Sequence, residues 1–252
     1  MSQTTHRLAV IILTRNEEKN IADCIASASI ADEILVIDSG STDRTREIAA
    51  AHGARVAEHA FDDDGFAGQR NFALTQTAAD WVFYLDADER IVPELREELS
   101  RITTQPPSAA YAVKRWNIVF GQKMKHGEHG PDWCVRLFPR DGVHWEGVVH
   151  ERPVTGLPVH RLTGTLDHHT YTDWDRYFVK FNQYTSLMAE RMAEAGRRAT
   201  FADILFHPFF AFVRFYFLRL GFLDGKQGFI FAVNHYFYTM IKYVKLYYRQ
   251  RS

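Results

Sequence analysis

The stretch from Trp81 to Glu89 constrains this chain most, because a short apolar and aromatic run ends in two carboxylates, Asp86 and Asp88. The run has the length and composition of a buried strand, which places both carboxylates where the strand leaves its sheet. Ligands bind at that edge in open α/β sheets. Two close carboxylates repel each other unless a cation lies between them, and Mg²⁺ or Mn²⁺ binds carboxylates together with water and phosphate oxygens. The stretch therefore predicts a metal site for a phosphate-bearing substrate.

The composition bounds the class of protein. The chain has 252 residues, 46% of them hydrophobic and 24% charged, so it can bury the core of one large domain or of one domain with an appendage. A net charge of -1 gives no overall basic field, so we expect no nucleic-acid partner. Cys24 and Cys134 form no paired motif, and the apolar segment from Leu8 to Leu13 is too short for a signal peptide. We therefore expect a cytoplasmic protein.

The first hundred residues alternate between two patterns. Continuous apolar runs predict buried strands over residues 8–14, 33–38, 53–58 and 81–86. Helical patterns follow each of them, over about 16–28, 44–51, 67–78 and 93–102. This alternation predicts an α/β fold, with a mostly parallel, Rossmann-like sheet covered by helices on both faces.

The pattern changes after Pro106-Pro107. Residues 110–120, 135–139 and 143–151 have β-type composition, and the glycines and histidines of 121–130 predict a mobile loop where an acceptor site could be built. A long helix is expected over about 174–195. We therefore expect a first domain over residues 1–172, divided into halves at 105/106, and a helical region over 173–252.

The region from Phe201 to Tyr248 is rich in aromatic and aliphatic residues interrupted by single charges. It contains no run of eighteen uncharged apolar residues, which argues against a membrane-spanning helix. Amphipathic helices lying at a membrane surface are the favoured interpretation, because Tyr and Phe prefer the headgroup level and Lys and Arg reach anionic lipid. The alternative is a helical pair packed on the core or in a homo-oligomer.

Polar groups also follow the other predicted strands, in Thr14-Arg-Asn16-Glu17, in Asp38-Ser-Gly-Ser-Thr-Asp43 and in Gln69-Arg70-Asn71. Together with Asp86 they can bind a nucleotide. Asp38 would accept from a base N–H, Glu17 would face a ribose hydroxyl, and Arg70 would contact base or phosphate. The alternatives are helix capping by Thr14 and Asp43 and a surface ion pair for Arg70. We favour the cap for Asp43 and ligand binding for Asp38.

Four segments, Ile12-Leu-Thr-Arg-Asn-Glu-Glu, Val36-Ile-Asp-Ser-Gly-Ser-Thr-Asp, Gln69-Arg-Asn-Phe-Ala and Leu85-Asp-Ala-Asp-Glu, resemble family 2 inverting glycosyltransferases in order and spacing. Further on, the segments Arg136-Leu-Phe, Val148-Val-His-Glu, Leu223-Asp-Gly-Lys and Lys242-Tyr-Val-Lys-Leu resemble the branch that builds the bacterial lipopolysaccharide core, similar to the glucosyltransferase that acts on inner-core heptose. The resemblance implies the GT-A fold, a nucleotide-sugar donor such as a UDP-hexose, and Mg²⁺ or Mn²⁺.

The resemblance also implies roles for particular residues. Asp38 would read the uracil, Asp86 would lie near the ribose and the metal, and Asp88 would hold the metal on the diphosphate. His150 matches a histidine that reaches the diphosphate or its metal in some relatives. His126 and His129 are expected to help bind a polar or phosphorylated acceptor, with a zinc site as the weaker alternative because no strong zinc spacing joins them.

Three carboxylates are candidates for the general base. Inversion requires a carboxylate that takes the proton of the acceptor hydroxyl. Family members place this base in an acidic pair before an Arg-Leu, and here that place holds Asp132 alone, before Arg136-Leu137. Asp132 is the first candidate, and Glu151 and Glu146 are the alternatives.

These observations predict a membrane-peripheral inverting glycosyltransferase on the inner face of the cytoplasmic membrane. It would move a hexose, glucose from UDP-glucose in the first instance, to a lipid-linked saccharide such as inner-core heptose. Two alternatives stay open. A polyprenyl-phosphate glycosyltransferase would require spanning helices, and a non-catalytic membrane-binding scaffold would require the polar strand ends to be coincidental.

Overall fold

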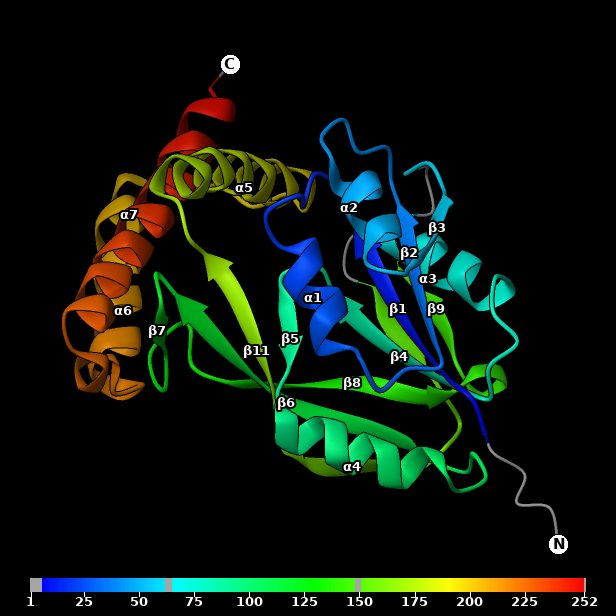
Figure 1. The fold of residues 1–252 in the computed structure, drawn as a ribbon. Coiled ribbons are helices and arrows are strands. Elements are labelled where there is room, and N and C mark those ends of the chain that lie inside the picture. The colour runs from blue at the N-terminus through cyan, green and yellow to red at the C-terminus, as the bar shows by residue number, and fades with distance from the viewer. Residues whose placement is uncertain (1–5, 62–64, 148–150, 252) are drawn as a thin grey trace, which may run out of the picture. The chain divides into compact units, whose positions relative to one another are not determined.

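The computed structural model describes residues 6–61, 65–147 and 151–251 (Figure 1). The chain forms two compact units. Unit 1 comprises residues 1–115 and 132–168, and unit 2 comprises residues 116–131 and 169–252. The chain passes from unit 1 to unit 2 for the second time between residues 168 and 169, close to the predicted boundary at 172/173. Residues 116–131, which we placed in the first domain, belong to unit 2.

The elements of unit 1 follow the predicted alternation in its first half. They are β1 (Leu8–Thr14), α1 (Ile21–Ser27), β2 (Glu33–Asp38), α2 (Thr45–Ala51), β3 (Arg55–Glu58), α3 (Gly65–Thr75), β4 (Trp81–Asp86), β5 (Glu89–Ile91) and α4 (Pro93–Thr103). The later elements are β8 (Asp132–Pro139), η1 (Arg140–Gly142), β9 (His144–Glu146) and β10 (Arg152–Val154). Two long strands, β6 (Ala110–Val119) and β11 (Val159–Tyr171), continue from unit 1 into unit 2.

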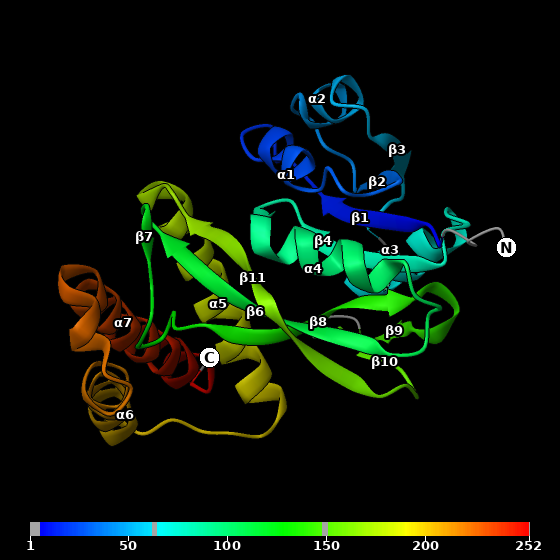
Figure 2. The same cartoon turned by 60° about the horizontal axis from the view of Figure 1, so that its bottom comes forward.

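The sheet has the order β3-β2-β1-β4-β8-β6-β11-β5, and its first four strands are parallel. The predicted parallel sheet is therefore confirmed for the first half of the chain. The second half adds antiparallel strands, because β8 pairs antiparallel with both β4 and β6. Figure 2 shows β6, β8 and β11 running alongside one another. The short strands β9 and β10 form a separate antiparallel ribbon.

Strand β1 is buried on both faces, which explains its continuous apolar sequence. Leu8, Val10 and Ile12 pack in a cluster with residues of α1, α2 and α4. Ala9 and Ile11 point to the other face and pack in a cluster with residues of α3. Because successive side chains alternate between faces, a single apolar strand joins the two halves of the core, as predicted.

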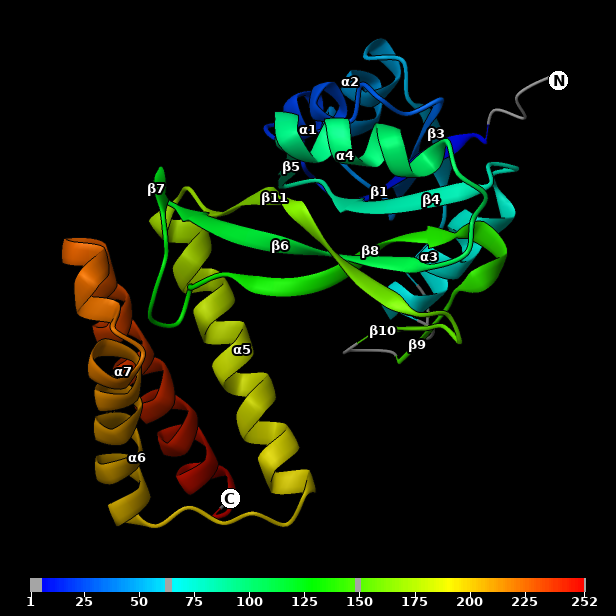
Figure 3. The ribbon, with the colours of Figure 1, turned by 90° about the horizontal axis from the view of Figure 1, so that it is seen from below.

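Unit 2 consists of the short strand β7 (Gln122–Lys123), which pairs with β6, and of α5 (Trp174–Glu194), α6 (Phe201–Val213), η2 (Arg214–Leu218), η3 (Gly221–Asp224) and α7 (Gly225–Arg249). The helix α7 packs against α5 and α6 (Figure 3). Asp224 explains why residues 116–131 belong to this unit. Its carboxylate is almost completely buried and accepts the backbone N–H groups of Lys125 and His126, the latter at 2.7 Å.

The segment Phe201–Leu218 is long enough and apolar enough to cross a membrane, judged by length and composition only. Asp203 and Arg214 interrupt it, so counting runs of uncharged residues does not reveal it. Several large apolar side chains are exposed here, including Phe206 (61%) and Phe210 (64%). Only 6% of the segment Phe201–Leu218 is buried. The segment therefore exposes a large apolar surface.

Candidate functional site

The carboxyl ends of three neighbouring parallel strands form the floor of the candidate site in unit 1. Thr14 of β1 lies in register with Asp38 of β2, and Leu13 lies in register with Asp86 of β4. Thr14 is buried, and its hydroxyl has no hydrogen-bond partner in the described part of the chain. The polar strand ends noted in the sequence thus lie at one edge of the sheet.

Asn16 joins the loops that follow β1 and β2. Its backbone is left-handed, with φ at 57°, and its side-chain oxygen accepts the backbone N–H of Thr42 at 2.8 Å. The backbone N–H of Glu17 donates to the hydroxyl of Thr45 at 2.8 Å. Asp43 accepts the N–H of Thr45, the first residue of α2, while the N-cap position is Arg44, which makes no side-chain capping bond. Asn16 therefore shapes the loop, and the Glu17 carboxylate lies beside it.

Asp38 is completely buried and holds the turn that follows β2. Its carboxylate accepts the N–H groups of Gly40 and Ser41, at 3.1 and 2.8 Å, and the hydroxyl of Ser41. Gly40 has φ at 82°, a conformation that favours glycine. These three bonds leave about one of the four lone-pair positions of a carboxylate for a base N–H. The base-reading role of Asp38 stays a prediction.

Gln69 and Arg70 start from the same turn of α3 but have different surroundings. The Gln69 amide donates to the backbone oxygens of His59 and Ala60, at 2.9 and 2.6 Å, and thereby holds the loop before α3. Arg70 is only 4% exposed, so the alternative of a surface ion pair is wrong. Its guanidinium lies over the rings of Tyr84 and Trp145, at 5.3 and 4.6 Å from their centroids.

The Arg70 guanidinium also faces two carboxylates. Its Nη2 atom lies 3.1 Å from Asp86 and 3.5 Å from Glu151. Its Nε and Nη1 atoms are buried and have no hydrogen-bond partner within the described ranges. Buried N–H groups are normally paired, so these two donors are available to an acceptor such as a phosphate or a base oxygen.

A chain of alternating charges runs from Asp86 to Asp132. Arg136 Nη2 lies 2.8 Å from Asp86 and 2.5 Å from Glu89, and Glu89 lies 3.2 Å from Arg115. Arg115 then holds both oxygens of Asp132, at 3.0 and 2.8 Å. Burial raises the pKa of Asp86, but the charges of Arg136 and Arg70 outweigh it and hold that pKa well below its usual value. Burial raises the pKa of Glu89, which is fully enclosed.

This charge chain affects the metal prediction. Both oxygens of Asp86 are bound by guanidinium groups, Arg70 on one and Arg136 on the other. These contacts occupy two of the four lone-pair positions of the carboxylate, and a cation bound at the others would lie beside two guanidinium charges that repel it. The geometry instead favours Asp86 as an anchor for the two arginines.

Asp88 has different surroundings from Asp86. Its side chain is 29% exposed, and Oδ2 lies 3.3 Å from Nε2 of His168. The pairing of β5 with β11 sets His168 opposite Glu89, beside the carboxylate. His150 lies outside the described residues. Among the residues that are described, no group of three or more His, Cys, Asp or Glu side chains is arranged to hold a metal ion.

The three candidates for the general base contact different residues. Asp132 is half exposed and bound to Arg115, and Glu151 is within 3.5 Å of Arg70. Glu146 belongs to the β9–β10 ribbon and pairs with His144 at 3.1 Å and with Arg152 at 3.5 Å. Its contact with His144 lowers the pKa of Glu146, which makes it a weaker base.

Four ionisable residues of the site were not assigned a role from the sequence: Glu89, Arg115, Arg136 and His168. Arg136 is 4% exposed, and a buried arginine has no distinct sequence signal when the carboxylates that bind it are far away along the chain. His168 lies near the end of β11. The register that brings it to Asp88 is a tertiary feature.

A parallel α/β half followed by antiparallel strands, with paired carboxylates at the carboxyl edge, is the GT-A architecture of glycosyltransferases. The family model for glycosyl transferase family 2 matches residues 9–156. The chain is 31% identical to the lipopolysaccharide core biosynthesis glycosyltransferase LpsC of Rhizobium meliloti, over 96% of this chain and 92% of the relative. This protein therefore belongs to glycosyl transferase family 2.

Other similar proteins also match over most of their length. An uncharacterized glycosyltransferase of Rickettsia typhi is 28% identical over 95% of this chain and 86% of its own length. Among solved structures, glucosyl-3-phosphoglycerate synthase from Mycobacterium tuberculosis, in complex with Mn²⁺, UDP and glucosyl-3-phosphoglycerate, has a TM-score of 0.47 and 18% identity, over 79% of this chain and 83% of that one. S. aureus TarS 1-349 has a TM-score of 0.47 and 16% identity, over 98% and 92%.

Proposed function

We propose that this protein is an inverting glycosyltransferase that moves a hexose from a UDP-sugar, in the first instance glucose, to a lipid-linked saccharide of the lipopolysaccharide core. The near full-length similarity to LpsC, whose name states lipopolysaccharide core biosynthesis, supports the acceptor class. The observation that carries the donor is the Arg70 guanidinium at the sheet edge, with two buried N–H groups that have no partner among the described residues. An acceptor-rich nucleoside diphosphate supplies what those donors lack.

The cation prediction rests on Asp88. One or two carboxylates, with diphosphate oxygens and water, suit Mg²⁺ or Mn²⁺, so Asp88 fits such a site and Asp86 fits it less well. His168 would supply a nitrogen ligand, which suits Mn²⁺ better than Mg²⁺. When bound, the cation would stabilise the negative charge that develops on the departing diphosphate.

The residues of the charge chain position the reacting groups. Arg136 and Arg70 hold Asp86 in its ionised form near the ribose, and Arg70 keeps two donors for the donor sugar. Asp132 is the proposed base that takes the proton of the acceptor hydroxyl. Arg115 takes one lone pair on each oxygen of Asp132, so two of the four lone-pair positions of the carboxylate are left to accept the proton of the acceptor hydroxyl. Glu151 and Glu146 are the alternative bases.

A panel of nucleotide sugars tests the donor. UDP or GDP release is measured for each sugar, with a deacylated, heptose-containing core oligosaccharide as acceptor and with Mn²⁺ present. We expect release from UDP-glucose to exceed release from each GDP-sugar at least about tenfold, because that ratio corresponds to the loss of one good hydrogen bond to the base. Acceptor-dependent release from a GDP-sugar alone would contradict the proposed donor. Stimulation by polyprenyl phosphate instead of the oligosaccharide would favour the polyprenyl-phosphate alternative, and absence of any nucleotide binding would favour the scaffold.

We also propose that the protein binds the inner face of the cytoplasmic membrane through α6. One face of α6 exposes large apolar side chains at helical spacing, namely Phe201, Leu205, Phe206, Phe209 and Phe210. Ile204 and Pro208, on the other face, are buried. Arg214 and Arg219 follow the exposed face and can meet anionic headgroups. A helical oligomer interface is the alternative occupant of the same face.

Substitution of this face should release the protein from membranes. We expect Phe206→Ser with Phe210→Ser to reduce co-sedimentation with anionic liposomes about tenfold or more, because each phenylalanine contributes about 1.5–3 kcal/mol when it is buried. The matched control is Phe178→Ser with Val179→Ser, which are also exposed, at 51% and 58%, but lie on α5. Equal sedimentation of both variants would contradict membrane binding through α6, and a change in molecular mass by light scattering would favour the oligomer.

A further inference from the structure

Unit 2 contains a separate polar pocket of about 70 Å³ that the proposed chemistry does not use. It is lined by the loop between β7 and β8, by the end of β11 and by one face each of α5 and α7. Its polar groups are the Glu128 carboxylate, the Lys180 amine, the imidazoles of His129 and His235, and the hydroxyl groups of four tyrosines, Tyr171, Tyr177, Tyr184 and Tyr238. Such a density of hydroxyl groups around one carboxylate is unusual for a packed helical core, where polar groups are paired.

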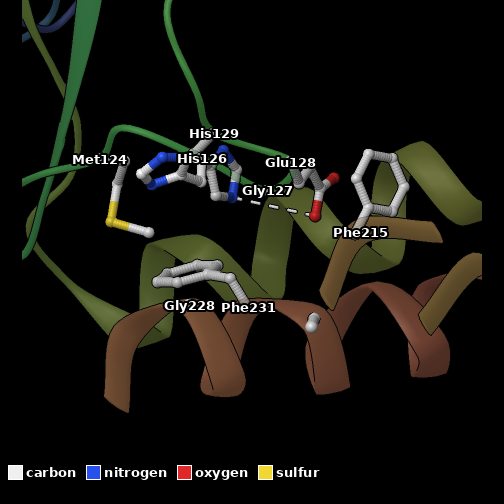
Figure 4. Close-up of a pocket in the computed structure, with 9 residues that line it drawn as sticks. Met124, His126, Gly127, Glu128, His129, Phe215, Gly228 and Phe231 are labelled. Carbon is white, nitrogen blue, oxygen red and sulfur yellow. Dashed lines mark ion pairs between the residues drawn. The ribbon is translucent and has the colours of Figure 1, made fainter. Parts of the chain in front are cut away.

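Glu128 is held in a fixed position. Its Oε1 atom lies 2.7 Å from Nδ1 of His235, and its Oε2 atom lies 4.0 Å from Nε2 of His129. Figure 4 shows the second contact, with Phe231 below the loop and Phe215 to the side of Glu128. The bonds from the loop backbone to Asp224 fix the residues just before it. The carboxylate is still 30% exposed, so a ligand can reach it.

The tyrosine hydroxyls are donors without a protein acceptor. In the part of the chain that the structure describes, none of the four has a hydrogen-bond partner. Burial, followed by the negative charge of Glu128, raises the pKa of Tyr171 to about 12, and the same two causes raise the pKa of Tyr177 and Tyr238. The phenols therefore keep their protons at neutral pH and can each donate one hydrogen bond and accept others.

The walls between these groups are aromatic. The rings of Tyr171 and Tyr177 meet edge to face at 4.9 Å, and those of Phe181 and Tyr238 do so at 5.6 Å. Apolar ring faces beside a carboxylate and several hydroxyls match a molecule that has apolar C–H faces and hydroxyl edges. That description fits a sugar ring.

We propose that the pocket around Glu128 binds a neutral sugar ring of the saccharide acceptor. This inference rests on the proposed function, in that it assigns the acceptor a site within unit 2. It refines the expectation from the sequence that the loop over residues 121–130 contributes to acceptor binding. The Glu128 carboxylate accepts from a pair of sugar hydroxyls, and the phenols of α5 and α7 donate to the others.

The test uses the full chain and the deacylated core oligosaccharide as probe. Tyr177→Phe and Tyr238→Phe each remove one hydroxyl that has no hydrogen-bond partner among the described residues, so neither should change the melting temperature. We expect each to raise the KM for the oligosaccharide about three- to tenfold and Glu128→Gln to raise it at least about tenfold, because bonds to charged groups are stronger. The KM for the nucleotide sugar and the affinity for UDP should stay unchanged.

Tyr236→Phe is the matched control, because Tyr236 lies on α7 outside the pocket. Calorimetric titration of the oligosaccharide without a donor separates this inference from the proposed function, since it requires no transfer. Binding that the double variant Tyr177→Phe with Tyr238→Phe loses supports the pocket even if no donor is used. Absence of binding to the unaltered chain, or equal affinity for the double variant and the control, overturns the inference.

Discussion

Replacement of Asp88 by asparagine is expected to lower the rate of sugar transfer at least about 100-fold, because it removes the negative charge that would hold the cation on the diphosphate. Asparagine keeps the size of the side chain, and Asp88 is 29% exposed, so the fold should be preserved. The measurement is the initial rate of UDP release over a titration with Mn²⁺. Calorimetry of UDP with and without Mn²⁺ should show that the variant has lost the part of the affinity that depends on the metal.

Two further variants make this prediction specific. Asp23→Asn is the matched control, because that carboxylate is 80% exposed and lies 3.8 Å from Arg90. It should retain full activity. His168→Asn should reduce activity less than Asp88→Asn, and its loss should be larger with Mn²⁺ than with Mg²⁺, since it removes a nitrogen ligand. Full activity of Asp88→Asn at saturating Mn²⁺ would contradict the assignment of Asp88 to the metal site.

The strand ends illustrate what could be predicted from the sequence. A continuous apolar run such as Leu8 to Thr14 is a local signal, and parallel strands bring their carboxyl ends to one edge by geometry alone. Thr14, Asp38 and Asp86 therefore gather as their positions in the chain require. The hydrogen bonds of Asp38 to its own turn also follow from a local sequence, Asp-Ser-Gly-Ser.

The contacts between distant segments were not predictable in the same way. Arg136 meets Asp86 and Glu89 because β8 inserts next to β4 in antiparallel register, and no local pattern specifies that pairing. His168 reaches Asp88 through the pairing of β11 with β5. The attachment of residues 116–131 to unit 2 depends on Asp224, about a hundred residues further along the chain. Each of these contacts depends on how distant segments pair, and the sequence around each residue carries no signal of its partner.

Arg136→Met is expected to destabilise the protein by about 3–5 kcal/mol, which is typical when one partner of a buried ion pair is removed. Arg136 is 4% exposed and lies between two carboxylates, so methionine fills much of its volume but leaves Asp86 and Glu89 with less compensating charge. Urea unfolding at pH 7.5 measures the change. Arg44→Met is the control, since Arg44 pairs with Glu47 on the surface and should have no measurable effect.

The pH dependence separates lost charge compensation from lost packing. In Arg136→Met, Glu89 loses the charge that most offsets its burial, so its pKa, which is already raised, should rise further, while the pKa of Asp86 should rise from its lowered value with Arg70 still beside it. A group with a raised folded pKa loses its contribution to stability as the pH rises through that pKa, so the deficit should be largest at pH 8 and shrink toward pH 5. Glu89→Gln added to Arg136→Met should recover part of the loss at pH 8, because it removes one uncompensated charge. A deficit that is constant with pH, and a double variant less stable than Arg136→Met, would mean that Arg136 acts through packing alone, and the charge chain from Asp86 to Asp132 would then have no electrostatic role in the site.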